Sequence, residues 1–295
     1  MAPTRIALIG FGEVGSIFAR DLRAAGHSRI TAFDIALPDA ASKAARNARQ
    51  QEVTTAASAA EAVAGAELVI CAVTAGSALA AARSGAAGLG HAPFFLDVNS
   101  VSPGTKREAA GVVDAAGGRY VEAAVMTSVP PHGIRSPMLL GGPHADAFMP
   151  VAKALGMRAE VFSNEVGGAS SVKMCRSIMI KGMEALATEC MLTARRYGVE
   201  KQVLASLADT LPHPDWPGLV RYMMSRALIH GRRRAEEVRE VVRTVAEAGL
   251  TPMQSPATAE RQDWAADRGA ELAPEILATK DLDTLLDAVL AKAAR

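Results

Sequence analysis

The sequence predicts a two-domain protein in which an α/β domain precedes an all-α domain. Short apolar runs typical of buried strands alternate with amphipathic helical segments in the first half of the chain, which indicates a parallel sheet covered by helices. Beyond Tyr197 only helical patterns remain. The length of 295 residues allows two domains. We expect the first to cover residues 1–164 and the helical domain, opening with a long interdomain helix, to cover residues 165–295.

A glycine-rich turn joins the first expected strand to the first expected helix. The apolar run Ile6–Ile9 leads directly into G-x-G-x-x-G. In such a turn the first glycine permits a sharp bend, the second lets the backbone approach a pyrophosphate, and the third lets the helix lie close to its strand. The helix N-terminus then favours the anion. The sequence therefore predicts a Rossmann dinucleotide-binding domain, with cofactor-binding residues Gly10, Phe11, Gly12, Glu13, Val14 and Gly15.

The second expected strand indicates which dinucleotide binds. It ends at Asp34, 19 residues past Gly15, where a carboxylate can accept hydrogen bonds from the adenosine ribose. Because a carboxylate repels a 2′-phosphate, Asp34 favours NAD, although Arg46 or Arg49 could reach round and keep NADP open. The alternative is that Asp34 only initiates a turn.

Two further buried strands are expected at residues 67–73 and 93–98. The carboxyl ends of parallel strands meet at one edge of a sheet, which is where ligands of this fold bind. We therefore expect Val73, Thr74 and Ser100 to line the cofactor. Before the first of these strands, Ser58 is expected to cap a helix with Glu61 three residues on.

Composition excludes several other classes of protein. The 32 basic residues nearly balance 31 acidic residues, so no overall field attracts nucleic acid or a membrane surface. Cys71, Cys175 and Cys190 have neither disulfide-framework nor metal-ligand spacing, and we expect no metal and reduced thiols in a cytoplasm. Because the sequence has no apolar run of membrane-spanning length, we expect no transmembrane helix, and we expect no signal peptide. The expected partner is a small-molecule substrate.

These motifs, in this order, resemble the β-hydroxyacid dehydrogenases, the family of 3-hydroxyisobutyrate dehydrogenase and 6-phosphogluconate dehydrogenase. Residues 97–103 (D-V-N-S-V-S-P) carry the resemblance most strongly. Residues 120–126 resemble the strand before the family's substrate loop, and residues 167–173 resemble the glycine-rich entry to its catalytic-lysine helix. The resemblance covers roughly residues 4–195. It implies an NAD(P)-dependent oxidoreductase acting on CH–OH groups, and a homodimer with intertwined helical domains.

The resemblance also implies catalytic and substrate-binding residues. Lys173 stands at the catalytic lysine, which exchanges a proton with the substrate hydroxyl while hydride moves between the same carbon and the nicotinamide. Ser177 replaces the second Asn of the family's K-x-x-N-N, and we expect it to position the substrate or Lys173. The family's S-G-G substrate loop is here Met126, Thr127 and Ser128, and we expect the two hydroxyls to take over anion binding.

The residues around Lys173 support this role independently of the family. The segment from Ala169 to about Arg196 is apolar on all sides, which predicts a buried spine helix. A lysine in such surroundings loses hydration, so we expect its pKa to fall toward the range of a usable base.

The helical domain departs from the family pattern. A Lys-Asp pair usual in the family is here Glu236 and Glu237, preceded by His230 and three consecutive arginines. A buried carboxylate needs a partner, so we expect Arg233 or Arg234 to face the substrate cleft, pairing with Glu236 or binding a substrate anion. We include His230 in the substrate site. The alternative is that all three arginines are solvated and the substrate is less acidic.

The sequence therefore predicts hydride transfer between nicotinamide and a small β-hydroxy acid or related hydroxy or carbonyl compound. One alternative is an imine reductase-like reduction of C=N bonds on the same architecture. Such enzymes commonly lack the lysine, so Lys173 counts against it. The other is a non-catalytic NAD-binding protein.

Overall fold

The computed structural model describes residues 5–211 and 213–293. They divide into two compact units, the first running to Met174 and the second beginning at Cys175. The first unit contains the sheet, and the described part of the second is helical. The division falls inside a long helix, somewhat later than the expected boundary at residue 164. None of the helices among these residues has the length and apolar character needed to cross a membrane.

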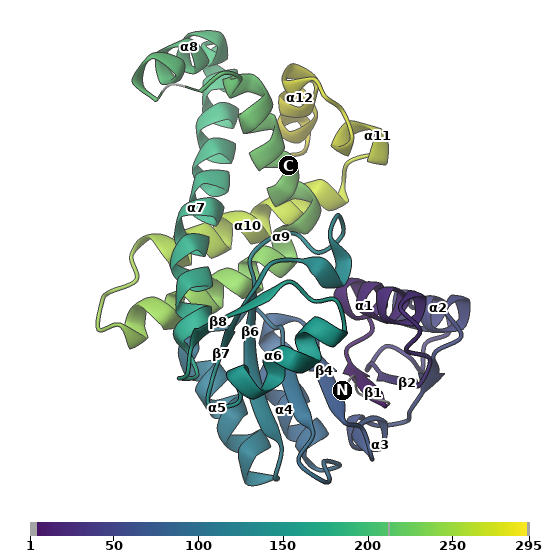
Figure 1. The fold of residues 1–295 in the computed structure, drawn as a ribbon. Coiled ribbons are helices and arrows are strands. Elements are labelled where there is room, and N and C mark those ends of the chain that lie inside the picture. The colour runs from purple at the N-terminus through teal and green to yellow at the C-terminus, as the bar shows by residue number, and fades with distance from the viewer. Residues whose placement is uncertain (1–4, 212, 294–295) are drawn as a thin grey trace. The chain divides into compact units, whose positions relative to one another are not determined.

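The strands of the first unit form one sheet, in the order β3-β2-β1-β4-β5-β6-β7-β8 (Figure 1). The pairs from β3 to β6 are parallel, β7 is antiparallel to β6, and β8 is parallel to β7. The strand order reverses between β1 and β4, and the carboxyl ends at such a switch point are where α/β sheets bind ligands. The strands are β1 (Ile6–Ile9), β2 (Ile30–Phe33), β3 (Thr54–Thr55), β4 (Leu68–Cys71), β5 (Phe94–Asp97), β6 (Arg119–Val125), β7 (Met138–Gly141) and β8 (Ala159–Ser163).

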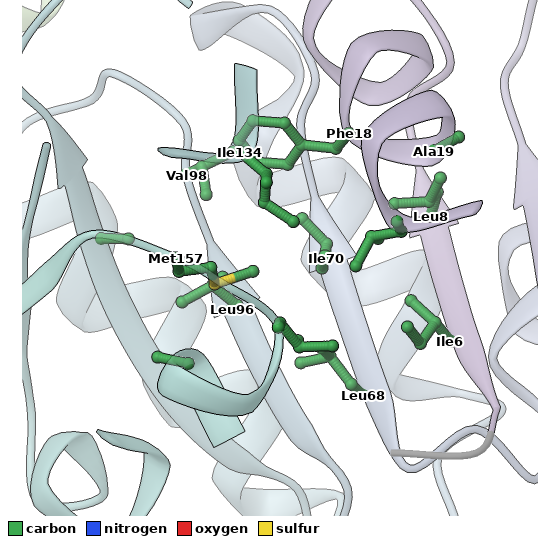
Figure 2. Close-up of a cluster of buried hydrophobic side chains, with 14 of the residues drawn as sticks. Ile6, Leu8, Phe18, Ala19, Leu68, Ile70, Leu96, Val98, Ile134 and Met157 are labelled. Atoms are coloured by element: carbon green, nitrogen blue, oxygen red, sulfur yellow. The ribbon is translucent and has the colours of Figure 1, made fainter. Parts of the chain in front are cut away.

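Helices cover both faces of this sheet because successive strand residues point to opposite sides. Leu8 and Ile70 lie in the core beneath α1, α2 and α6, which Figure 2 shows together with Phe18 of α1. Ile9 and Val69 lie in a second core against α3, α4 and α5. The helical segments are α1 (Glu13–Ala24), α2 (Lys43–Gln50), α3 (Ala59–Val63), η1 (Ala75–Ser77), α4 (Ala78–Ala86), α5 (Pro103–Ala115), η2 (Gly133–Arg135) and α6 (Ala145–Ala154).

The expected N-terminal cap at Ser58 is confirmed. Its hydroxyl accepts a hydrogen bond from the backbone N–H of Glu61, and the Glu61 carboxylate accepts one from the N–H of Ala57. Such reciprocal bonds satisfy backbone donors that the first turn of a helix leaves open. A short helix is thereby started between β3 and β4.

The second unit packs long helices around their own apolar core. Buried Met191, Met224 and Leu285 come from three different helices. Apolar residues at helical spacing form a core stripe on α9, where Val238 and Val241 are buried, and this helix ends two residues before Gly249, which has φ +75°. The helices are α7 (Gly168–Tyr197), which begins in the first unit, α8 (Glu200–Thr210), α9 (Trp216–Glu247), α10 (Gln254–Ala270), α11 (Pro274–Leu277) and α12 (Leu282–Ala293).

The prediction that α7 is buried on all sides is wrong for this single chain. Met179 exposes 64% and Leu186 68% of its surface, and Tyr197 at the end of the helix is exposed too. α7 carries apolar residues on every side, and the core of this single chain covers only some of them. An apolar strip on α7 therefore faces outward.

Candidate functional site

The three glycines of the β1–α1 turn have different surroundings. Gly10 has φ +94°, and a Cβ there would lie 2.3 Å from the carbonyl oxygen of Ala72. A Cβ on Gly15 would lie 2.0 Å from the carbonyl oxygen of Gly10, whereas a Cβ on Gly12 would meet nothing within 4 Å. The sharp bend at Gly10 and the close packing at Gly15 are as expected from the sequence. Gly12 leaves the open approach that a pyrophosphate requires.

The start of α1 is suited to an anion. Gly12 is its N-cap residue, and no side chain among the described residues caps the first turn. The free N–H groups of the first turn therefore remain available, and the helix dipole favours negative charge there. Glu13 and Val14 follow in this turn, and Phe11 is buried beside it. These residues fit a dinucleotide phosphate chain.

Asp34 fastens the end of β2 to the glycine turn. One carboxylate oxygen accepts a hydrogen bond from the N–H of Phe11 at 2.7 Å, and the other accepts from the N–H of Ala36 at 2.9 Å. The turn-initiating role is thus present. Each carboxylate oxygen has two lone pairs, so Asp34 retains capacity to accept from a ribose. Ribose binding by Asp34 stays a prediction.

The carboxyl ends of β4 and β5 are joined through Asn99. Its amide oxygen accepts from the N–H of Val73 at 2.7 Å, and its amide nitrogen lies 3.3 Å from the Cys71 sulfur. Thr74 follows as the N-cap of η1, and half-buried Ser100 follows Asn99. The structure therefore brings Val73, Thr74 and Ser100 to the edge of the sheet that also carries the glycine turn.

A buried charge network beneath this edge was not found from the sequence. Lys106 Nζ lies 3.0 Å from one carboxylate oxygen of Asp97, and the Tyr120 hydroxyl donates to the other at 2.7 Å. All three side chains are fully buried. Burial, together with the negative charge of Asp97, raises the pKa of Tyr120 well above its ordinary value, so its hydroxyl stays protonated. The network fixes the strand end that leads to Asn99 and Ser100.

Cys71 lies close to this network, and its thiol is unreactive. Burial and the charge of Asp97 raise the pKa of its thiol, and Asn99 and Lys106 only partly oppose the shift. A thiol with a raised pKa carries little thiolate and reacts slowly. Its role is packing at the sheet edge.

The expected substrate loop after β6 is held by α1. Met126 is half-buried, and Thr127 and Ser128 are exposed. Farther along, the Asp21 carboxylate of α1 accepts from the N–H of Ile134 at 2.9 Å. The loop is therefore attached to the helix that follows the glycine turn. Sequence reasoning missed Asp21, because the contact spans more than a hundred residues.

Glu122 fixes the beginning of α7. This residue of β6 is fully buried, and its carboxylate accepts from the N–H of Gly167 at 2.6 Å and of Ser170 at 2.5 Å. A carboxylate at a helix N-terminus makes charge-assisted bonds and complements the helix dipole. The one signal in the sequence is an acidic residue inside an otherwise apolar strand. Glu122 thus holds in place the first turn of the helix that carries Lys173.

Lys173, Ser177 and Lys181 follow one another at four-residue spacing on α7, which places them on one helix face. Lys173 is half-buried, and Ser177 and Lys181 are buried. The Ser177 hydroxyl accepts a hydrogen bond from Lys181 Nζ at 3.0 Å, and Lys181 also pairs with Glu237 of α9 at 2.7 Å. The expectation that Ser177 positions the substrate or Lys173 stays a prediction. Sequence reasoning missed Lys181.

The expected pairing of Arg233 or Arg234 with Glu236 is wrong. Arg234 is buried and makes a two-bond ion pair with Glu184 of α7, with Nε at 2.6 Å from the carboxylate, and Arg233 pairs with Glu237. The physical reason is that consecutive helix residues point about 100° apart, so the arginines meet different neighbours. Half-buried Glu236 has one carboxylate oxygen without a hydrogen-bond partner among the described residues.

Arg232 and His230 precede Arg233 and Arg234 on α9. Arg232 is exposed and pairs with Asp263 at 2.6 Å and with Asp267. His230 is half-buried on the same helix. Of the three arginines, Arg234 is therefore buried, whereas Arg232 and Arg233 are exposed. Each of the three pairs with a different acidic partner.

Taken together, the sheet order, the glycine turn and the strand-end polar residues define a dinucleotide-binding oxidoreductase fold. The model of the NAD binding domain of 6-phosphogluconate dehydrogenase matches residues 5–167, more than half of the chain. A domain of unknown function (DUF1932) matches residues 194–265. The chain belongs to the β-hydroxyacid dehydrogenase family, as a divergent member, and its first unit binds a nicotinamide cofactor.

Individual relatives agree with this family assignment. A conserved hypothetical protein from Sinorhizobium meliloti 1021 is 34% identical, with a TM-score of 0.73 over 98% of this chain and 96% of that chain. A conserved protein of unknown function, described as structurally similar to 3-hydroxyacid dehydrogenases, is 32% identical, with a TM-score of 0.67 over 89% and 97%. The 3-hydroxyisobutyrate dehydrogenase of Pseudomonas aeruginosa is 28% identical over 72% of each chain.

Proposed function

We propose that the protein is an NAD(P)-dependent dehydrogenase that oxidises a small β-hydroxy acid, or reduces the corresponding carbonyl compound. The observation that carries the proposal is the half-buried Lys173, close to the start of a helix that buried Glu122 fixes. A lysine shielded in this way, on a rigid element, is suited to proton transfer. Fixing the first turn of α7 limits the positions that Lys173 can take.

The proposed reaction divides the chemistry between cofactor and protein. The nicotinamide, when bound, accepts or supplies the hydride. Lys173 takes the proton of the substrate hydroxyl during oxidation and returns it to the oxygen during reduction. Ser100, Thr127, Ser128 and Ser177 offer hydroxyls that hold the substrate oxygens, with Met126 as an apolar neighbour. The placement of Thr127 and Ser128 on an exposed loop supports contact with a ligand that enters from solvent.

The proposed cofactor is NAD. The Asp34 carboxylate supports this preference because its negative charge opposes a 2′-phosphate, and its free lone pairs suit a ribose hydroxyl. The two hydrogen bonds from Phe11 and Ala36 keep the carboxylate at the end of β2. Arg46 and Arg49 each donate one hydrogen bond to a backbone oxygen, of Ala41 and Ala40, and keep further N–H donors, so NADP stays the alternative cofactor.

The proposed substrate is anionic, although the helical-domain cations are largely committed to other partners. Glu184 occupies Arg234, and Glu237 occupies Arg233. A substrate carboxylate would therefore depend mainly on the hydroxyls of the loop. This is a weaker anion site than a free arginine would give, and it favours a small acid.

A direct assay tests the function and separates it from its alternatives. NADH consumption should be followed on 3-keto acids, the semialdehyde of 3-hydroxyisobutyrate and cyclic imines, and NAD reduction on 3-hydroxyisobutyrate and 3-hydroxybutyrate. The proposal requires turnover on a hydroxy acid or its carbonyl partner. Turnover on cyclic imines alone would favour C=N reduction. Tight NADH binding without turnover on any of these compounds would favour a non-catalytic binding protein.

We propose in addition that the protein acts as a cytoplasmic homodimer. The outward apolar strip on α7 supports the homodimer, because exposed apolar patches of this kind mark interaction surfaces. Replacing Met179 and Leu186 together by Glu should shift the mass measured by light scattering from dimer to monomer. An unchanged mass would place any subunit contact elsewhere.

A further inference from the structure

Ser177 differs from the other serines of α7 in what holds its hydroxyl. Ser170 and Ser171 both donate to the carbonyl oxygen of Gly167, at 3.1 and 2.6 Å, which is the ordinary local bond of a serine in a helix. Ser177 is 4% exposed and makes no such bond within the described part of the chain. Its oxygen instead accepts from Lys181 Nζ at 3.0 Å. A side chain, and not the helix backbone, therefore orients this hydroxyl.

The bond between Lys181 and Ser177 has a fixed direction. An ammonium group has three donors and no acceptor, so Ser177 must be the acceptor. The hydroxyl proton of Ser177 is then left to point elsewhere. An ammonium that donates to a hydroxyl also polarises it, which strengthens the O–H as a donor and weakens the remaining lone pair as an acceptor.

Lys181 is itself held by charge. Its Nζ lies 2.7 Å from a carboxylate oxygen of Glu237, and the other oxygen of Glu237 pairs with Arg233. The side chains of Lys181 and Glu237 are 7% and 10% exposed, so this ion pair is shielded from water. Breaking one partner away from a buried pair is costly, so the ion pair with Glu237 holds the Lys181 side chain in place. The chain Arg233–Glu237–Lys181 thus ends on the Ser177 oxygen.

We propose that Lys181 is a positioning residue that makes Ser177 a directed hydrogen-bond donor to the substrate. The proposal rests on the proposed function, in which Ser177 lies beside the substrate one helical turn from Lys173. A polarised O–H suits an oxygen acceptor, such as a carboxylate, carbonyl or alkoxide oxygen. It suits an N–H donor, such as an ammonium or iminium group, poorly. Lys181 therefore selects oxygen-bearing substrates through Ser177.

A double-mutant cycle tests this role with the hydroxy acid that the wild-type enzyme turns over, 3-hydroxyisobutyrate being tried first. Ser177→Ala and Lys181→Met should each raise KM about tenfold, the loss expected for one charge-assisted hydrogen bond. The double variant should be no worse than Ser177→Ala alone, because Lys181 acts through Ser177. Lys181→Arg keeps a cationic donor and should restore most of the affinity.

A matched control and a stability measurement separate this role from a structural one. Lys280→Met removes an exposed lysine of the same unit and should leave KM unchanged. A Lys181→Met variant that lowers the melting temperature but keeps KM overturns the proposal, as does a double variant whose KM rises by the product of the single effects. If Lys181→Met does not fold, the same cycle with Lys181→Gln replaces it.

Failure of the proposed function would look different. Turnover that is absent overturns the dehydrogenase function and this proposal with it. Turnover that survives Lys173→Met removes Lys173 from the mechanism, and with it the placement of Ser177 beside the substrate. Turnover that requires Lys173 but shows additive Ser177 and Lys181 effects overturns the positioning role alone.

Discussion

The cofactor edge of the first unit and the charged seam of the second are built by different means. At the cofactor edge, backbone geometry sets the site: three glycines within six residues shape the turn, and Asp34 binds two backbone N–H groups. In the seam between α7 and α9, side chains about fifty residues apart pair in a shielded interior, as Arg234 does with Glu184. Local spacing therefore reveals the first region, and tertiary contacts decide the second.

The seam should be the more sensitive region to loss of a single charge. Arg234→Met leaves Glu184 buried without its main partner, so the free energy of unfolding should fall by about 3–5 kcal/mol. Arg232→Met, two residues earlier, removes an exposed guanidinium and should change it little. Urea denaturation of the two variants measures the difference. Equal losses would mean that the seam is no more shielded than the surface.

Substitutions at two glycines of the β1–α1 turn should separate an effect on stability from an effect on cofactor binding. Gly15→Ala drives a Cβ into the backbone of Gly10 and should cost about 1–3 kcal/mol of stability. Gly12→Ala meets open space, so it should keep the wild-type melting temperature and still weaken NADH binding about tenfold or more. Thermal unfolding and NADH fluorescence titration read the two effects. A Gly12→Ala protein with unaltered NADH affinity would remove the pyrophosphate from this turn.

The smallest expected effect is on cofactor choice. Asp34→Asn removes the charge that opposes a 2′-phosphate and keeps one acceptor for the turn, so the preference for NADH over NADPH should fall about tenfold. Asp39→Asn is the matched control, because Asp39 is a nearby exposed aspartate that also accepts a backbone N–H. Calorimetric titration with both cofactors measures the ratio. Wild-type protein that binds NADPH more tightly would reverse the assignment.

The features that can be predicted from the sequence are those formed by residues close to one another along the chain. The glycine turn, the Ser58 cap and the α9 core stripe are all patterns within about ten residues, and the structure contains each of them. The last two strands were not predicted. β7 has only four residues between a proline and a glycine, and β8 is partly exposed, so neither has the apolar run of a buried strand.

Long-range contacts account for the rest of the differences. The partners of Asp97, Glu122 and Lys181 are fixed only when distant elements pack together. The sequence alone could not assign separate partners to the three consecutive arginines, because the rotation of α9 about its axis decides which of them meets Glu184. The apolar pattern of α7 likewise does not indicate whether its side chains are covered by the same chain or by a second molecule.

In the proposed nicotinamide-dependent reaction, Lys173 transfers the proton. The most direct test is the turnover number of Lys173→Met on the hydroxy acid that the wild-type enzyme oxidises, measured beside its NADH dissociation constant. Met keeps the volume of the side chain and removes its charge, so turnover should fall by about 10² or more, the range for a lost general acid or base, while NADH affinity is retained. Unchanged turnover in Lys173→Met would contradict the account.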